Sequence, residues 1–403
     1  MTRFLATEKE DKPAVSTMNA AALCAVGAEK AVSNEFRKMG LEVYEGAYGR
    51  VRFRADLPGL YKALMGSRAA DRILLECALF EAKDFDALFE GTRSVAWDMY
   101  IRRGMGLVVS KIRSNRSILK AETSIQSVVH KAAAAHLCQK WGIRRLPDEG
   151  EKAEIRVYVE KDKVSLLLDL CGEALFKRGY RGSGGPAPLR ETTAAAIILL
   201  SGWKRKFPLY DPFCGSGTIT MEAAMYAWDM APGLSRHFFL ERLGLGDRKT
   251  EDLIREELLH RIDFSRQINI MGSDADEGAA GLAKANMERI FSFVRSRKKA
   301  GENKSIPFPP LFKAIPMENA YAHTERAGFI ITNPPYGKRM GDKEASQELY
   351  QKMAGLAQRF PGWHLVLITD HPGFESFFGK NSDSCREITN GAIQSYMYQY
   401  EKL

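Results

Sequence analysis

The sequence predicts an α/β protein, in which an α+β region precedes a doubly wound, largely parallel sheet in the carboxy-terminal half. Two stretches carry this prediction. Residues 209–228 read as a short apolar strand, a glycine-rich turn with Gly215 and Gly217, and an apolar helix, which together form the nucleotide-binding corner of such a sheet. Residues 328–332 read as a second buried strand, which ends at Asn333 and two prolines. Strands that alternate with helices indicate a parallel sheet.

The composition is that of a globular chain with a basic surface. Of 403 residues, enough for two or three domains, 45% are hydrophobic and 27% are charged. No apolar run approaches the ~20 residues that span a bilayer, and the amino terminus lacks a signal peptide's apolar core. The six cysteines have no Cys-x-x-Cys spacing, so we expect free thiols of a reducing compartment and neither disulfides nor a metal site. A net charge of +9 favours a polyanionic partner.

The amino-terminal part predicts two small modules, residues 1–66 and 67–168. In the first, we expect helices at 22–39 and 57–66 and strands at 43–44 and 50–54. In the second, we expect strands at 73–80 and 106–113, helices at 85–95 and 123–140 with Thr123 or Ser124 as N-cap, and a hairpin of 155–160 with 164–169.

Residues 101–145 contain ten Lys or Arg against one acid, Glu122. Such a run is usually a solvated face. Here the run is interleaved with structured elements, so contact with RNA is at least as well supported as a solvated face. The candidate RNA-binding residues are Lys111, Arg113, Arg116, Lys120 and Lys131.

The segment from 170 to 190 is rich in Gly and Pro and reads as a linker into a helix at 191–200. The glycine-rich turn that follows is not a phosphate-binding P-loop, because no Lys follows its second glycine, and Thr220 excludes Gly-x-Gly-x-x-Gly. In the second motif, Asn-Pro-Pro-Tyr, the prolines fix the backbone just beyond a strand. The Asn333 side-chain oxygen and the Pro334 carbonyl are then two acceptors beside the aromatic face of Tyr336, a set that suits a planar exocyclic amine.

Together, Asp-Pro-Phe-Cys-Gly-Ser-Gly-Thr and Asn-Pro-Pro-Tyr, in this order, resemble the amino-methyltransferases that use S-adenosylmethionine. The resemblance implies cofactor binding by Asp211, Pro212, Phe213, Cys214, Gly215, Ser216, Gly217 and Thr218, and catalysis by Asn333, Pro334, Pro335 and Tyr336. In relatives, a segment similar to 178–189 lies beside the cofactor, so Arg178, Tyr180 and Leu189 are further candidates.

The next strand of the sheet should end in an acid that takes the ribose hydroxyls. Residues 268–276 provide Asp274, followed by Ala275, although nearly 60 residues separate it from the glycine turn instead of the usual ~20. The alternative is that Asp274 or Asp276 only caps the helix expected at 277–293. Relatives place another acid at the cofactor adenine, and Glu318 matches it. The remaining expected elements are helices at 277–293 and 346–360 and strands within 311–319, at 363–369 and, antiparallel, at 392–400.

Residues 20–400 as a whole resemble bacterial 23S rRNA guanine-N2 methyltransferases of the RlmL/YpsC type. The resemblance implies a ferredoxin-like module (1–66), a THUMP-like RNA-binding domain (67–168) and a Rossmann-like class I methyltransferase domain (169–403). It also implies a cytoplasmic enzyme with no membrane partner, which methylates 23S rRNA or a large-subunit precursor. The alternatives are a tRNA guanine-N2 methyltransferase, a DNA adenine-N6 methylase and a non-catalytic RNA-binding assembly factor. The oligomeric state and the target nucleotide stay open.

Overall fold

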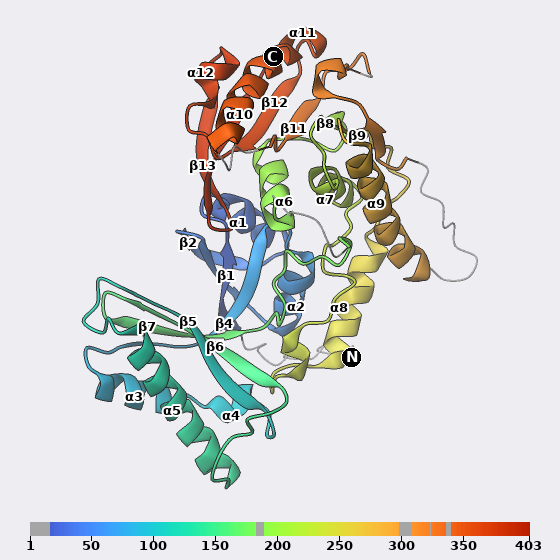
Figure 1. The fold of residues 1–403 in the computed structure, drawn as a ribbon. Helices are drawn as coiled ribbons and strands as arrows, with labels where there is room; N and C mark the ends of the chain where they lie inside the picture. Colours follow the sequence, from blue (N-terminus) through green and yellow to red (C-terminus); the bar gives the residue numbers. More distant parts are fainter. Residues whose placement is uncertain (1–16, 183–188, 298–307, 323, 336–339) are drawn as a thin grey trace, which may run out of the picture.

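The computed structural model describes residues 17–182, 189–297, 308–322, 324–335 and 340–403, with side chains from 344 onward in the last range. Two seven-stranded sheets organise the described residues, one in each half of the chain (Figure 1). The α/β class and the Rossmann-like carboxy-terminal half predicted from the sequence are confirmed.

The first sheet has the order β2-β3-β1-β4-β7-β6-β5. Its strands are β1 (Met18–Cys24), β2 (Glu42–Ala47), β3 (Arg50–Ala55), β4 (Ala70–Glu81), β5 (Gly106–Asn115), β6 (Lys152–Glu160) and β7 (Lys163–Asp169). Strand β4 pairs with β1 along one side and with β7 along the other. The modules expected at 1–66 and 67–168 therefore share one continuous sheet.

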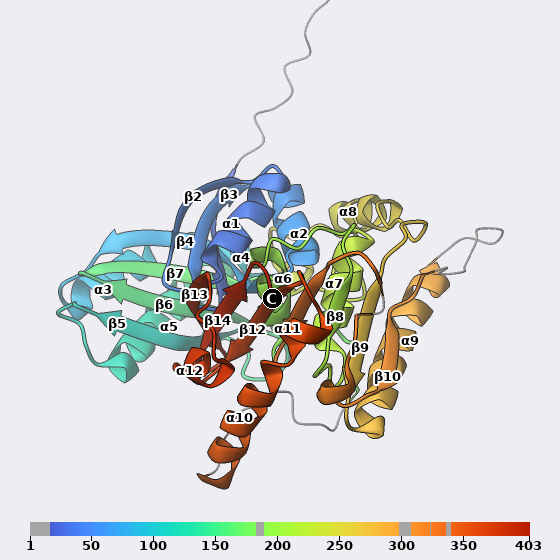
Figure 2. The ribbon, with the colours of Figure 1, turned by 90° about the horizontal axis from the view of Figure 1, so that it is seen from above.

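The helices of this half are α1 (Glu29–Lys38), α2 (Leu57–Gly66), α3 (Phe85–Arg93), α4 (Trp97–Tyr100) and α5 (Glu122–Trp141). Helices α1 and α2 lie between the first sheet and the carboxy-terminal half, where they meet α6 (Glu191–Leu200) and α8 (Arg248–His260) (Figures 1 and 2).

Two details of the sequence prediction were wrong here. The helix expected at 22–39 is a strand as far as Cys24 and becomes helical only at Glu29. The alanines of β1 are buried between β3 and β4, and this pairing overrides their helix propensity. Helix α5 begins at Glu122 after Ala121, which makes no side-chain cap, so neither Thr123 nor Ser124 is its N-cap.

The second sheet has the order β10-β9-β8-β11-β12-β14-β13. Its strands are β8 (Leu209–Asp211), β9 (Ile270–Asp274), β10 (Leu311–Ala314), β11 (Phe329–Thr332), β12 (His364–Thr369), β13 (Ser384–Asn390) and β14 (Ile393–Tyr400). The first five are parallel to one another, and β14 is antiparallel to β12, as predicted. The strand order reverses between β8 and β11, which is where doubly wound sheets bind ligands.

Helices cover both faces of this sheet. They are α6, α7 (Thr218–Ala227), α9 (Glu277–Arg297), α10 (Met340–Met353), α11 (Leu356–Arg359) and α12 (Phe374–Phe378). Helix α8 packs on α2, and two short 3-10 turns are η1 (Phe239–Arg242) and η2 (Met317–Asn319). Neighbouring residues of β11 enter different cores, with Ile331 in the core shared with the amino-terminal half and Ile330 in the core under α10 and α11.

The two halves are joined by buried and half-buried polar contacts as well as by that shared core. The Arg178 guanidinium donates to the Arg68 carbonyl and lies 3.4 Å from the Glu222 carboxylate. Asp71 accepts hydrogen bonds from Arg190 and Thr192 at the start of α6. The linker expected at 170–190 is thus a packed junction along the part that the structure describes.

Over the described ranges, no helix is both long and apolar enough to cross a bilayer. All six cysteines are free thiols, as predicted.

Candidate active site

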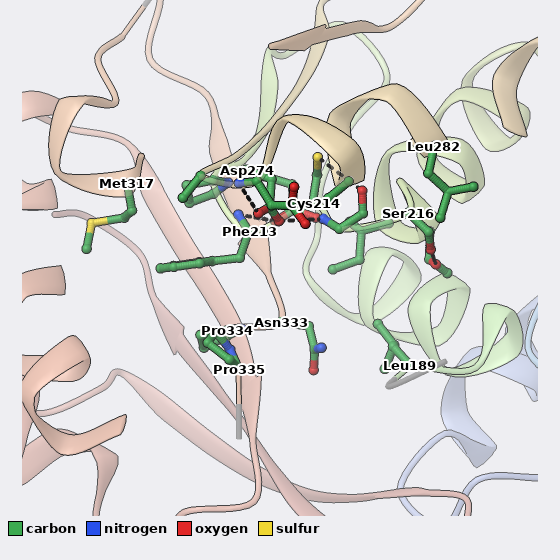
Figure 3. A pocket seen from close by; sticks show the side chains of 18 of the residues that line it. Leu189, Phe213, Cys214, Ser216, Asp274, Leu282, Met317, Asn333, Pro334 and Pro335 are labelled. Atoms are coloured by element: carbon green, nitrogen blue, oxygen red, sulfur yellow. Dashed lines mark hydrogen bonds between the residues drawn. The ribbon is translucent and has the colours of Figure 1, made fainter. Parts of the chain in front are cut away.

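A cavity of about 860 Å³ opens at the carboxyl ends of β8, β9 and β11, at the point where the strand order reverses. Figure 3 shows side chains from these three strand ends and from α9 around one space. The predicted site residues that line it are Asp211, Pro212, Phe213, Cys214, Gly215, Ser216, Thr218, Asp274, Ala275, Glu318, Asn333, Pro334, Pro335 and the further candidate Leu189. Fold topology therefore gathers residues that are more than 100 positions apart.

The glycine-rich turn forms one wall. Gly215 and Gly217 have φ values of +51° and +83°, a region that side chains other than glycine rarely adopt. A Cβ at Gly215 would extend into open space, whereas one at Gly217 would lie 3.0 Å from the Ala283 Cβ. Gly215 therefore keeps the cavity open. Gly217, which does not line the cavity, lets α7 pack closely against α9.

The Asp274 carboxylate accepts hydrogen bonds from two backbone N–H groups, one of them in the glycine-rich turn. One carboxylate oxygen accepts from the Gly215 N–H at 2.9 Å and the other from the Asp276 N–H at 3.0 Å. A carboxylate has about four acceptor positions, so Asp274 retains capacity for a ligand's hydroxyls. The capping role belongs to Asp276, because its side chain accepts a hydrogen bond from the Gly278 N–H in the first turn of α9.

Asp211 and Thr332 connect the two central strand ends. The Thr332 hydroxyl and the Phe213 N–H both donate to Asp211 Oδ1, at 2.6 and 3.1 Å. Both side chains are buried. Burial and, to a smaller extent, the Asp274 charge raise the pKa of Asp211, whereas the two hydrogen bonds lower it; the net result is a pKa of about 7. The end of β11, which leads into Asn333, is thus bonded directly to the end of β8.

Asn333 and the two prolines form the wall opposite the glycine turn (Figure 3). Asn333 is half-buried, Pro334 is buried and Pro335 is exposed. In the same view, the Phe213 ring lies between this wall and Met317. Tyr336 falls outside the described residues.

Sequence reasoning missed several further lining residues, most of them apolar. Leu282 and Gly278 come from the first turns of α9, Ile219 from α7, Met317 from η2 and Leu349 from α10. The four-residue spacing of Gly278 and Leu282 after Asp274 was the available signal, since it places both on one helix face.

Arg178 and Tyr180 do not line this cavity, so the prediction that they do was wrong. Both bond Glu222 at the junction of the two halves. Their neighbour Arg181 approaches the site instead, donating to the Leu189 carbonyl at 2.6 Å and pairing with Glu191 at 3.3 Å. The sequence carries no signal for which of Arg178, Tyr180 and Arg181 is directed toward the cavity.

The predicted RNA-binding residues are separate from the cavity. Lys111, Arg113, Arg116, Lys120 and Lys131 are all exposed, and Arg113 lies 3.8 Å from Glu122. The structure therefore leaves these cations accessible on β5, on α5 and on the segment between them.

Among the residues that the structure describes, one group of side chains of metal-ligand type lies away from the cavity. The His237 Nδ1 lies 3.9 Å from Glu241 and 3.7 Å from Glu251. Arg248 and Arg255 already pair with these two carboxylates, so we assign no metal to this group.

Comparison with known proteins decides the family. Residues 178–399 match the family described as "RMKL-like, methyltransferase domain", and residues 19–74 match the "RlmL ferredoxin-like domain". The chain belongs to this methyltransferase family. The predictions of a ferredoxin-like amino-terminal region and of a methyltransferase that uses S-adenosylmethionine are thereby confirmed.

Two relatives by sequence illustrate the extent of the similarity. The chain is 32% identical over 378 residues to "Putative RNA methyltransferase YpsC" of Bacillus subtilis (strain 168), covering 93% of this chain and 94% of that protein. It is 31% identical over 394 residues to "Ribosomal RNA large subunit methyltransferase K/L" of Cellvibrio japonicus (strain Ueda107), covering 94% of this chain. The chain spans about half of the K/L proteins' length, 50% in that case.

Two solved structures show the same similarity in fold and sequence. A "possible methylase from Clostridium difficile 630" is 35% identical with a TM-score of 0.87, covering 96% of this chain and 99% of that one. SMU.472, "a putative methyltransferase complexed with SAH", is 32% identical with a TM-score of 0.84, covering 96% and 98%.

Proposed function

We propose that this protein transfers a methyl group from S-adenosylmethionine to the exocyclic N2 amine of a guanine in RNA, and that the RNA is 23S rRNA or a large-subunit precursor. The observation that carries the proposal is the placement of Asn333 and Pro334 across one cavity from the glycine turn and Asp274. A cofactor site and a pair of amine acceptors thus share one space.

The cavity suits the cofactor. Its volume of about 860 Å³ lies within the ~300–1,000 Å³ of small-molecule sites. Asp274, with acceptor capacity left over, would take the ribose hydroxyls, and Glu318, exposed at the rim, would take the adenine amine. Phe213, Leu282 and Met317 supply the apolar contacts.

The cofactor supplies an electrophilic methyl sulfonium, so the protein needs alignment more than acid–base power. A guanine amine is a poor nucleophile because its lone pair is delocalised into the ring. If Asn333 Oδ1 and the Pro334 carbonyl each accept one N–H, the nitrogen becomes more tetrahedral and its lone pair points toward the methyl carbon. We assign the stacking of the base to Tyr336. A base in a helix has to be flipped out to reach such a pocket.

RNA as the substrate is supported by the amino-terminal half and by the relatives. Exposed cations on the first sheet and on α5 suit a phosphate backbone, and the K/L relatives are named for ribosomal RNA. An enzyme of ribosomal RNA with six free thiols belongs in the cytoplasm.

The test is the transfer of a labelled methyl group to 23S rRNA, bulk tRNA and duplex DNA, side by side. We expect label in rRNA, recovered as N2-methylguanosine. Label in tRNA would change the substrate but keep the mechanism. Label only as N6-methyladenine in DNA would overturn the proposal, and no label in any acceptor would favour a non-catalytic RNA-binding factor.

The assigned chemistry is tested by Asn333→Ala, with Asn381→Ala as the control because Asn381 is exposed and does not line the cavity. We expect Asn333→Ala to reduce transfer by about 100-fold or more while binding of S-adenosylhomocysteine stays nearly unchanged. Activity within a few-fold of wild type would refute the role of Asn333.

A further inference from the structure

The first sheet carries a second hollow, a groove of about 650 Å³ whose lining residues are all different from those of the active-site cavity. Strands β2 and β3 and their turn contribute Tyr48, Arg50 and Arg52, and β5, β6 and the turn after β5 contribute Arg113, Arg116 and Tyr158. The groove therefore combines cations and aromatic rings from segments more than 60 residues apart.

Strand alternation explains why these side chains share a face. In β3, Val51, Phe53 and Ala55 are buried, with Phe53 against Phe36 of α1. Arg50 and Arg52 consequently point to the opposite face. Three strands separate β3 from β6 in the sheet order, yet the Arg50 guanidinium lies 4.3 Å from the centre of the Tyr158 ring. The sheet therefore curls so that its two sides face each other across the groove.

The charges in the groove favour an anionic ligand. Four arginines line it against two glutamates, Glu45 and Glu160. Arg52 is compensated, at 3.5 Å from Glu45 and 3.9 Å from Glu76. Arg116 makes no ion pair with any carboxylate among the residues described, and it is exposed with a φ of +49°.

The aromatic groups favour a ligand with free planar rings. Tyr48, at the β2–β3 turn, is 93% exposed, so its ring is open to stacking. Tyr158 already has one face covered by a guanidinium. Arginine planes and tyrosine rings are the usual partners of unpaired bases, whereas the bases of a duplex are stacked on one another and unavailable.

We propose that this groove binds a single-stranded segment of RNA, with a base on Tyr48, a second against the Arg50–Tyr158 pair, and phosphates at Arg113 and Arg116. The proposal rests on the proposed RNA substrate and identifies which part of it the amino-terminal half holds. The volume of about 650 Å³ is that of a site for a small ligand, which matches a few nucleotides and not a duplex.

The test is the fluorescence anisotropy of a labelled single-stranded 12-nucleotide RNA with the full chain, compared with its duplex and with poly-glutamate. The variants are Tyr48→Ala and Arg116→Gln. The matched controls are Tyr44→Ala and Arg54→Gln, because Tyr44 and Arg54 are partly exposed on β2 and β3, pack on each other and do not line the groove. All four replaced side chains lie on the surface of the first sheet, away from the cofactor cavity.

We expect Tyr48→Ala to weaken binding by about 5- to 100-fold, the effect of losing one stacked base. Arg116→Gln should weaken it less, and should reduce the slope of log affinity against log salt by about one, as for one phosphate contact. The controls should stay within two-fold of wild type.

The proposal that the groove binds single-stranded RNA would be overturned by any of three results. These are equal losses of affinity in the variants and the controls, equal affinity of the protein for the duplex or for poly-glutamate, and no RNA binding by the wild type. The methylation assay separates this from the proposed function. If the variants bind RNA as wild type does while rRNA is methylated, the groove fails and the function stands. If RNA binding depends on Tyr48 but no RNA is methylated, the groove stands and the function fails.

Discussion

Asp211→Asn tests the electrostatics at the point where the two central strands meet. Both hydrogen bonds that hold this side chain, from Thr332 and from the Phe213 N–H, end on Oδ1. An asparagine oxygen accepts both equally well. The substitution therefore removes a buried charge and leaves the described hydrogen bonds in place.

The expected change in the free energy of unfolding follows from the pKa of Asp211. Burial raises the pKa of Asp211 from 3.8 to about 7, a difference of roughly 3 units or about 4 kcal/mol at 1.36 kcal/mol per unit. Below pH 3.8 the carboxyl is protonated in both the folded and the unfolded chain. As the pH rises from there to about 7, the unfolded chain ionises first, so the stability of the native protein falls. The Asp211→Asn variant does not undergo this loss of stability. About 3 kcal/mol of the loss in wild type occurs between pH 5 and pH 8.

The assay is urea unfolding of wild type and Asp211→Asn at half-unit steps from pH 5 to pH 8, followed by tryptophan fluorescence. We expect the advantage of the variant in free energy of unfolding to grow with pH and to level off above pH 7. The control is Asp247→Asn. The Thr250 hydroxyl holds the pKa of Asp247 below its usual range, so this position titrates below the measured window. A constant difference between Asp211→Asn and wild type across the range would refute the raised pKa.

Three further predictions concern the same region and its support. Thr332→Val should lower the free energy of unfolding at pH 8 by about 1.5–3 kcal/mol, the value of a hydrogen bond to a charged group, and Thr332→Ser should restore most of it in the same urea assay. Gly217→Ala should destabilise the fold by about 1–3 kcal/mol through its positive φ and its contact with Ala283. Gly215→Ala shares the positive φ but its Cβ meets no atom, so it should destabilise the fold less and should also weaken S-adenosylhomocysteine binding, measured by calorimetry. Glu222→Gln leaves the buried Arg178 guanidinium without its counter-charge and should cost about 3–5 kcal/mol, seen as a lower midpoint of thermal unfolding; an unchanged midpoint would contradict this.

The local signals in the sequence determined the fold class and most of the cavity. A strand, a glycine turn and a helix are encoded within about twenty consecutive residues, and two prolines after Asn333 mark a strand end without any knowledge of neighbours. The antiparallel last strand followed from its alternation. Edge strand β13 was missed because its first four residues are exposed and carry no apolar period.

Only the tertiary structure decided which of these elements meet. The bond between Thr332 and Asp211 joins positions 121 residues apart, and that between Gly215 and Asp274 joins positions 59 apart. Four other features likewise depend on sheet order and curvature. They are the shared strand β4, the inward position of Leu282, the displacement of Arg178 from the site, and the groove between Tyr48 and Arg116. Sequence patterns report the local periodicity of a strand or a helix, whereas strand order and sheet curvature arise from packing between distant segments, and no single segment encodes them.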